Sequence, residues 1–310
     1  MGRRTSGRPS HGWIIVDKPA GMTSARVVSR VLALTGAAKA GHGGTLDPAA
    51  TGVLPVALGE ATKTVSYVMD GTKTYRFTVR WGEARDTDDA EGRLTGTSPH
   101  RPSAEQIRAV LGEFTGTVEQ VPPAFSAVKI GGRRAFALAR AGQPAAMAAR
   151  TVRIDHFELA HLPGPDHAEF IVRCGKGTYM RGLARDLAQR LGTVGHVAAL
   201  RRTQVGRFGE DQAISLEFLE SVGHSAPPFA HLLAVETALD DIPALALNVA
   251  QADHLRHGRP VRVSGDGGRA FVEVGDLGEG EVLCAMAEGR IVALARFEGG
   301  EIRPFRVLNV

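Results

Sequence analysis

The chain has 310 residues, of which 43% are hydrophobic and 23% are charged. A chain of this length buries about three quarters of the surface that it exposes when unfolded, which predicts one large domain or two unequal ones. This composition excludes a disordered or fibrous protein. No apolar run approaches the about 18 residues of a membrane span, and residues 13–16 are too short for a signal-peptide core. Two cysteines, Cys174 and Cys284, are too few for a disulfide framework or a zinc site. We therefore expect a cytoplasmic protein with no membrane anchor and no metal.

The net charge is only +4, but it is unevenly distributed along the chain. Residues 1–46 carry seven Lys or Arg and one acid, and residues 170–207 carry eight Lys or Arg and one acid. Residues 208–255 contain eight carboxylates and no Lys or Arg. Such segregation favours a positive surface that binds a polyanion, with RNA or DNA as the first candidates. A set of unrelated solvated faces is the alternative.

The first elements in chain order are a tail, a strand and a helix. Residues 1–11 predict a flexible basic tail, and residues 12–17 predict a buried strand. A helix begins at Thr23 or Ser24, because either side chain can cap its first turn. Apolar and polar residues then alternate over residues 74–81, which predicts a strand with two different faces.

The middle of the chain predicts helices and strands in an irregular order. Ser103 and Gln106 have the spacing of a capping box at the start of a helix. Residues 151–160 and 168–174 read as strands, and residues 178–191 as a helix with leucines on one face. Because no βα unit repeats, the sequence predicts an α+β fold rather than a doubly wound one.

A change of pattern near residue 240 predicts a second domain. Pro227-Pro228 lies in the acidic, lysine-free stretch and predicts a domain boundary. Beyond it come short β-like pieces separated by glycine turns: 259–263, 269–274, 281–286, 290–296 and 302–307. We therefore expect a main domain over residues 12–240 and a small β-rich module over residues 245–310.

The densest chemical signal lies in residues 41–55, GHGGTLDPAATGVLP. Three glycines surround His42 and let the backbone approach a ligand or adopt positive φ. Asp47 is the first acid after Asp17 and precedes a proline that stiffens the loop. A carboxylate in a rigid, electropositive loop is a candidate nucleophile, and a turn in which it only caps backbone amides is the alternative. The absence of a Gly-Lys-Ser/Thr ending disfavours a phosphate loop.

Five motifs resemble, in order, those of the bacterial tRNA pseudouridine synthase B family. They are VDKPAGMTS (residues 16–24), GHGGTLDPAATGVLP with the following GEATK (41–63), QVPPAFSAVK (120–129), CGKGTYMR (174–181) and LRR (200–202). The resemblance covers about residues 12–215 and implies a mixed, mainly antiparallel sheet flanked by helices, which is the pseudouridine synthase fold. Residues 245–310 are similar, more distantly, to a PUA-like RNA-binding module.

The resemblance implies isomerisation of uridine to pseudouridine at position 55 in the T loop, with the tRNA elbow as the binding partner. The N1–C1′ bond breaks, the uracil turns, and C5 bonds to C1′, so nothing is oxidised and no cofactor is required. Asp47 matches the family nucleophile, Tyr75 the tyrosine that packs on the base and takes the C5 proton, and Arg181 the arginine that pairs with the aspartate. The alternatives to these catalytic roles are that Tyr75 only packs in the core and that Arg181 faces a phosphate of the RNA.

The same resemblance implies a set of substrate-binding residues. His42 matches the histidine that packs against the splayed RNA and helps to hold the flipped nucleotide. Tyr179 and Leu200 match positions that line the uracil pocket, and Asp89 matches an aspartate of the active-site network. The basic residues of the motifs complete the predicted substrate contacts: Lys18, Lys176, Arg201 and Arg202.

Two positions depart from the family pattern, because Phe125 and Phe136 stand where tyrosine is usual. The leading hypothesis is an enzyme with no obligatory protein partner. The alternatives are a related enzyme that works inside a guide-RNA particle, an RNA-folding chaperone without catalysis, and a glycosidase. A glycosidase needs a second carboxylate within roughly 5–10 Å of the first, and no partner is indicated by the sequence.

Overall fold

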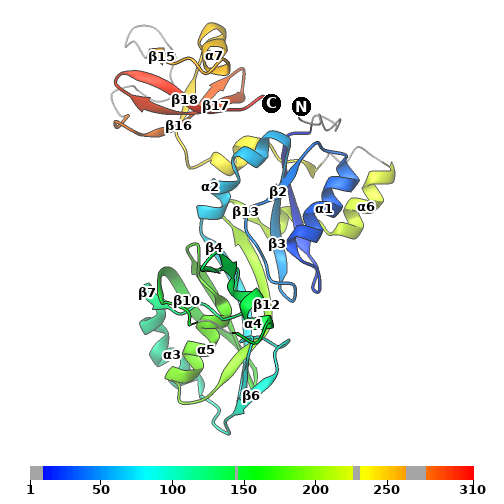
Figure 1. Cartoon of the computed structure of the whole chain (residues 1–310), viewed down its shortest axis with the longest axis vertical. Helices are drawn as coiled ribbons and strands as arrows, with labels where there is room; N and C mark the ends of the chain where they lie inside the picture. The colour runs from blue at the N-terminus through cyan, green and yellow to red at the C-terminus, as the bar shows by residue number, and fades with distance from the viewer. Residues whose placement is uncertain (1–9, 144–145, 226–230, 263–276) are drawn as a thin grey trace.

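The computed structural model describes residues 10–143, 146–225, 231–262 and 277–310, and a nine-stranded sheet forms its centre (Figure 1). The strand order is β1-β3-β12-β4-β11-β10-β7, with β2 beside β3 and β13 beside β12. The pair β3–β12 is parallel, and the other described pairs of this sheet are antiparallel. The predicted α+β class with a mixed, mainly antiparallel sheet is therefore confirmed. The bounds are β1 (Gly12–Lys18), β2 (Ala40–His42), β3 (Thr51–Leu58), β4 (Lys73–Trp81), β7 (Gly116–Gln120), β10 (Arg150–Gly164), β11 (His167–Cys174), β12 (Gly195–Val205) and β13 (Phe208–Gly209).

Two helices cover one face of β1 and β3, and Figure 1 shows them side by side: α1 (Ser24–Thr35) and α6 (Leu216–Ser225). The Thr23 side chain caps α1 by accepting a hydrogen bond from the N–H of Arg26, as the sequence predicts. Val27 and Val31 lie one turn apart and are fully buried in a cluster with Ile14 of β1. The burial of this apolar stripe fixes α1 beside the first strand.

Two further helices pack on the other half of the sheet: α3 (Ala104–Leu111) and α5 (Met180–Arg190). Ser103 and Gln106 form the predicted capping box at the start of α3. The rings of Phe77, Phe157 and Phe170 lie between the helices and the sheet. The ring centroids are 5.3 Å apart for Phe157 and Phe170, 5.5 Å for Phe77 and Phe170, and 6.2 Å for Phe77 and Phe157. Each such aromatic pair adds about 0.5–1.5 kcal/mol beyond burial of area. This core holds α5 rigidly against β4 and β12.

Short elements connect these layers. The hairpin β5–β6 encloses the acidic loop, residues 86–93, and β8–β9 forms a second hairpin before α4. Their bounds are η1 (Gly59–Lys63), α2 (Val65–Asp70), β5 (Glu83–Arg85), β6 (Leu94–Thr97), η2 (Gly112–Phe114), β8 (Lys129–Ile130), β9 (Arg133–Arg134), α4 (Ala135–Arg140), η3 (Glu210–Gln212) and η5 (Val235–Leu239). No helix in the described ranges is long and apolar enough to cross a bilayer.

The C-terminal part forms a separate five-stranded sheet in the order β14-β16-β17-β18-β15, at the top of Figure 1. Its elements are β14 (Ala244–Ala246), α7 (Val249–Arg256), β15 (Val261–Arg262), β16 (Val282–Ala287), β17 (Arg290–Glu298) and β18 (Glu301–Val307). The pieces predicted at 281–286, 290–296 and 302–307 correspond to β16, β17 and β18. The piece at 269–274 and the Pro227-Pro228 boundary lie outside the described residues.

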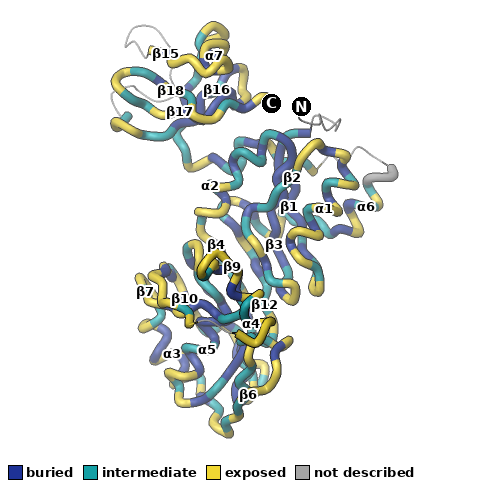
Figure 2. Tube along the Cα trace, viewed as in Figure 1, coloured by how far each residue is buried: buried dark blue, intermediate teal, exposed yellow. Residues whose placement is uncertain are grey.

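An apolar cluster joins the two sheets and includes Trp13 of β1 and Leu308 after β18. Beside it the Lys63 Nζ donates to the Val307 carbonyl (2.7 Å), and the Asn309 N–H donates to Glu60 (2.9 Å). Figure 2 shows buried positions along the inner strands and exposed ones on the loop tips and outer helix faces. Of the predicted tail, residues 1–9 lie outside the described residues, while Ser10 is buried.

Candidate active site

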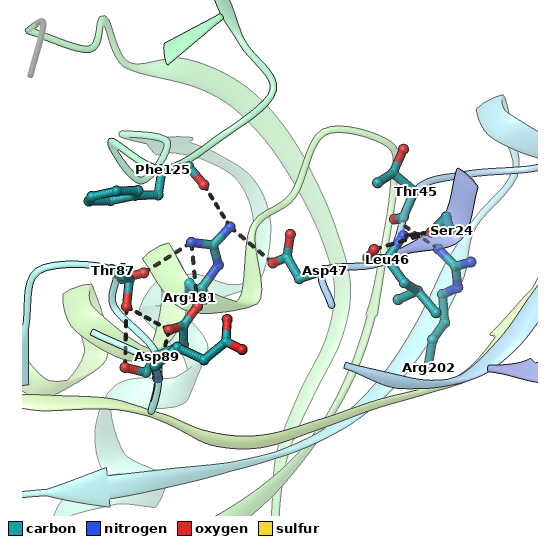
Figure 3. A network of polar contacts seen from close by, with 10 residues as sticks. Ser24, Thr45, Leu46, Asp47, Thr87, Asp89, Phe125, Arg181 and Arg202 are labelled. Atoms are coloured by element: carbon teal, nitrogen blue, oxygen red, sulfur yellow. Dashed lines mark hydrogen bonds and ion pairs between the residues drawn. The ribbon is translucent and has the colours of Figure 1, made fainter. Parts of the chain in front are cut away.

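The loop between β2 and β3 carries the predicted nucleophile Asp47, and for that prediction we call residues 43–50 the catalytic loop (Figure 3). The Ser24 hydroxyl, in the first turn of α1, donates to the Leu46 carbonyl (3.1 Å) and accepts from the Leu46 N–H (2.9 Å). The Pro48 carbonyl accepts from Lys18 Nζ (2.9 Å) and from the Gly21 N–H (2.8 Å). The backbone on both sides of Asp47 is therefore fixed by β1 and α1.

Arg202 of β12 holds the other end of the catalytic loop. Its guanidinium donates to the carbonyls of Val53 (2.9 Å), Gly44 (3.1 Å) and Thr45 (3.5 Å). Gly52 makes this approach possible, since a Cβ there would lie 2.2 Å from the Arg202 carbonyl oxygen and φ is +100°. The close parallel contact of β3 with β12 thus delivers the buried guanidinium to the loop.

Arg181 in the first turn of α5 reaches Asp47 from the opposite side (Figure 3). Its Nη2 lies 2.9 Å from Asp47 Oδ2, and its Nη1 lies 3.6 Å from Asp89 Oδ2. The same two nitrogens donate to the carbonyls of Thr87 and Phe125, each at 3.0 Å. The Arg181 side chain is 6% exposed and that of Asp47 is 41% exposed. A buried guanidinium with fixed acceptors therefore holds an accessible carboxylate.

Tyr75 of β4 lies directly opposite Arg202 of β12 in the sheet register, and Phe77 lies opposite Leu200. Residues two apart on a strand share a face, so Tyr75 and Leu200 lie on the face that packs against α5. Burial raises the pKa of the Tyr75 hydroxyl, the neighbouring Arg202 charge opposes that rise, and the Asp47 charge adds to it. The phenol is therefore neutral near pH 7 and interacts electrostatically with both residues.

His42 of β2 precedes the catalytic loop. Its Nδ1 accepts a hydrogen bond from the Gly44 N–H (3.4 Å), which leaves the proton on Nε2 when the ring is neutral. Burial, together with the Arg202 charge, lowers the pKa of the imidazole. His42 is therefore a neutral, partly buried ring beside the loop.

Two family profiles together match residues 32–240. The profile described as TruB family pseudouridylate synthase (N terminal domain) matches residues 32–180, and the tRNA pseudouridylate synthase B C-terminal domain matches residues 181–240. A protein of Rhodospirillum rubrum named tRNA pseudouridine synthase B is 52% identical over 100% of both chains. Its namesake in Bradyrhizobium diazoefficiens is 51% identical over 99% of this chain and 88% of its own. The chain belongs to the tRNA pseudouridine synthase B family. It isomerises uridine to pseudouridine in tRNA.

Solved structures share the fold of this synthase. The structure of an H/ACA RNP bound to a substrate RNA containing 2′-deoxyuridine aligns with a TM-score of 0.74 at 24% identity, over 97% of this chain and 86% of that chain. A Cbf5-Nop10-Gar1 complex aligns with a TM-score of 0.72 at 26% identity, over 99% and 89%. Together with the family match, these alignments confirm the pseudouridine synthase fold.

Two of the predicted substrate-contacting cations of the synthase lie inside the protein. Lys18 is 0% exposed and Arg202 is 1% exposed, and both donate to backbone carbonyls around the catalytic loop. Burial lowers the pKa of Lys18 to about 8, while the Asp47 charge opposes this shift. In the structure both cations therefore support the loop, and the substrate contact predicted for them stays a prediction.

The other predicted contacts are placed differently. Lys176 is 70% exposed and pairs with Asp70 (2.9 Å). Arg201 points away from Arg202, as adjacent strand residues must, and its guanidinium binds Asp17 through two nitrogens (2.9 Å and 3.0 Å). Tyr179 is partly buried and forms the N-cap position of α5.

The sequence did not predict several groups that hold the catalytic loop and Arg181 in place. Ser24 lies in the first motif, where its position predicts only a helix cap. Thr87 and Phe125 bind Arg181 through backbone carbonyls, which every residue type has, so the sequence gives no sign of them. Asp88 has the left-handed φ of 59° and binds Arg185 (3.0 Å), which shapes the acidic loop around Asp89. Among the described residues, no group of three His, Cys, Asp or Glu is arranged to hold a metal.

Proposed function

We propose that the enzyme modifies the uridine at position 55 of the tRNA T loop, and that it acts in the cytoplasm without a protein partner or a cofactor. The family motifs support the position, and the tRNA substrate supports the compartment. The observation that carries the catalytic proposal is the contact of 2.9 Å between the accessible Asp47 carboxylate and the buried Arg181 guanidinium. Such a charge-assisted contact fixes both the position and the direction of the attacking oxygen.

Asp47 is the nucleophile in this proposal. The target uridine must leave the folded T loop, because its reacting atoms are buried there. Attack of the carboxylate on C1′ or on C6 gives a covalent adduct, the N1–C1′ bond breaks, and the uracil turns. C5 then bonds to C1′, the carboxylate is released, C5 loses its proton and N1 gains one. The product is an isomer of the substrate, so the balance needs no further reactant.

Arg181 and Asp89 keep Asp47 in its attacking orientation. Arg181 cannot swing toward solvent, since its two terminal nitrogens are also bonded to the Thr87 and Phe125 carbonyls. Asp89 is itself held by the Thr87 hydroxyl (2.5 Å) and by the Glu91 N–H (3.1 Å). Reaction rates respond steeply to displacement of a reacting atom, which is why this rigidity matters.

Tyr75 packs on the flipped uracil and takes the C5 proton. Its place on the α5-facing side of β4, beside Leu200, supports the first role. Its raised pKa makes the phenolate rare at neutral pH, and the phenolate that forms is a strong base for the C5 proton. His42, as a neutral ring before the catalytic loop, packs against the RNA from which the nucleotide has moved.

The test is pseudouridine mapping in a transcribed tRNA incubated with the purified enzyme alone, with a transcript carrying cytidine at position 55 as the control. We expect modification at position 55 with the wild-type enzyme and none with Asp47→Asn. The variant should bind tRNA within a few-fold of wild type, because affinity comes mainly from basic residues. Residual turnover above about one per cent of wild type contradicts the nucleophile role. A requirement for an added protein contradicts independent action.

A further inference from the structure

The Gln120 side chain pairs with the main chain of Tyr179 in both directions. The Tyr179 N–H donates to Gln120 Oε1 (2.8 Å), and Gln120 Nε2 donates to the Tyr179 carbonyl (3.0 Å). Gln120 is 3% exposed, so water does not replace either bond. The Gln120 amide therefore pairs with the Tyr179 main chain as a neighbouring β-strand residue would. This pairing links the end of β7 to the start of α5.

The Tyr179 side chain does not cap α5. The first N–H groups of a helix lack partners within the helix, and Tyr179, at the N-cap position, supplies no side-chain hydrogen bond to them. Gly182 fits against the amide, because a Cβ there would lie 3.3 Å from Gln120 Cδ and Nε2. The start of α5 is thus pressed onto the Gln120 side chain.

Two more contacts tie the segment after Gln120 to α5. The Val121 carbonyl accepts from Arg185 (2.8 Å), and the Phe125 carbonyl accepts from Arg181 (3.0 Å). Of the three links, the Gln120 pair lies nearest the start of the helix. It fixes the backbone two residues before Arg181, whose guanidinium must reach Asp47.

We propose that Gln120 is a positioning residue of the active site: its amide sets the first turn of α5 so that Arg181 reaches Asp47 and Tyr179 faces the substrate. The inference rests on the catalytic roles proposed for Asp47 and Arg181. An amide is suited to this task because it offers a donor and an acceptor in one plane. An ionised carboxylate of the same shape has no donor and would repel the Tyr179 carbonyl.

The isosteric variant Gln120→Glu gives a sharp test. A protonated glutamic acid has one donor and one acceptor and restores both bonds, whereas the carboxylate breaks one. Burial disfavours the charged form, so the pKa of the new carboxyl should lie above the ordinary value of about 4.3. The kcat of this variant, divided by that of wild type at each pH, should therefore rise as the pH falls from 8 to 5.5.

The matched experiment measures kcat and KM for tRNA over this pH range with Gln120→Glu, Gln120→Ala and Gln189→Glu. Gln189 is an exposed residue near the end of α5, so its variant has the same chemical change away from the contact. We expect Gln120→Ala to lose about 10- to 100-fold in kcat at every pH, with KM nearly unchanged. Gln120→Glu should match it at pH 8 and recover on acidification, and Gln189→Glu should behave as wild type.

Gln120→Ala in an Arg181→Lys background tests the route of the effect. If Gln120 acts through Arg181, the second substitution adds little to the first, as coupled residues do. A wild-type kcat in Gln120→Ala, or a Gln120→Glu/wild-type ratio that does not change with pH, overturns the proposal. Full additivity with Arg181→Lys overturns it as well. Turnover by Asp47→Asn, measured in parallel, would instead contradict the proposed function and leave the pH result for Gln120 to be judged separately.

Discussion

Among the four basic residues predicted to contact the substrate, the two buried ones and the two nearer the surface have different partners. Beneath the catalytic loop, Lys18 and Arg202 are almost fully buried and donate to backbone carbonyls, and Arg202 also forms a hydrogen bond with the Tyr75 hydroxyl. Nearer the surface, Lys176 is exposed and Arg201 is half-buried, and both pair with carboxylates. All four residues lie in the family motifs, and Arg201 and Arg202 are adjacent in sequence. For these four residues, we therefore expect burial to decide whether a cation supports the catalytic loop or binds the RNA.

The difference has an energetic basis. A buried charge is costly unless hydrogen bonds satisfy it, and the loop carbonyls supply those bonds to Arg202. Breaking such a set leaves carbonyls unpaired and displaces the loop. An exposed ion pair contributes about 0–1 kcal/mol, so a phosphate can replace its carboxylate partner at little cost. Substitutions in the buried set should therefore lower kcat, whereas substitutions in the surface set should change the salt dependence of tRNA binding.

Among the substitutions that test this comparison, the largest effect is expected at Tyr75, next to the buried set. Tyr75→Phe keeps the ring and removes the hydroxyl, and loss of a general base costs about 100- to 10,000-fold in rate. Because burial raises the pKa of Tyr75, the phenolate fraction and the wild-type rate should increase with pH from 7 to 9, whereas the variant should show no such increase. Tritium release from C5-labelled tRNA measures both. A variant that releases tritium at the wild-type rate would mean that Tyr75 only packs.

Arg202→Lys should have the next largest effect. The ammonium keeps the charge but cannot bond three carbonyls on two segments as the guanidinium does. We expect kcat to fall about 10- to 100-fold, with the salt dependence of tRNA binding unchanged. Arg201→Lys is the matched control and should retain kcat. A flatter salt dependence in Arg202→Lys would show that Arg202 contacts phosphate after all.

Arg201→Gln should change binding and spare catalysis. Neutralising one phosphate contact lowers the slope of log K against log salt by about one. We expect that decrease, with kcat at saturating tRNA unchanged. Titrations from 50 to 200 mM salt measure the slope. An unchanged slope would contradict the predicted phosphate contact. It would mean that Arg201 keeps its carboxylate partners, such as Asp17, in the complex.

Lys176→Met should give the smallest change. Lys176 is 70% exposed beside Asp70, so we expect it to meet the RNA as a single surface charge. A slope decrease of less than one, with wild-type kcat, is expected from the same titrations. A loss of kcat would place Lys176 in the catalytic centre and weaken the distinction between the two sets.

Local patterns predicted much of the fold. The Thr23 cap, the Ser103–Gln106 capping box and the alternating strand over residues 74–81 all have signals within a few residues, and the structure has each of them. The central strand β3 had no such signal. It is buried at every position after Thr51 and contains Pro55, so it lacks the alternation of a half-exposed strand. Strand β12 was missed because bulges near Ala199 and Gln204 interrupt its alternation.

By itself, the sequence determined the family, the reaction and the candidate nucleophile, because chemistry depends on residue type at motif spacing. Only the tertiary structure decided which motif residues are buried and what they hold. Gln120 binds Tyr179 across 59 residues of sequence, and Arg181 binds the Thr87 carbonyl across 94. These contacts have no local signal, because a backbone carbonyl belongs to every residue type. Sheet order and helix packing alone bring such groups within hydrogen-bond distance.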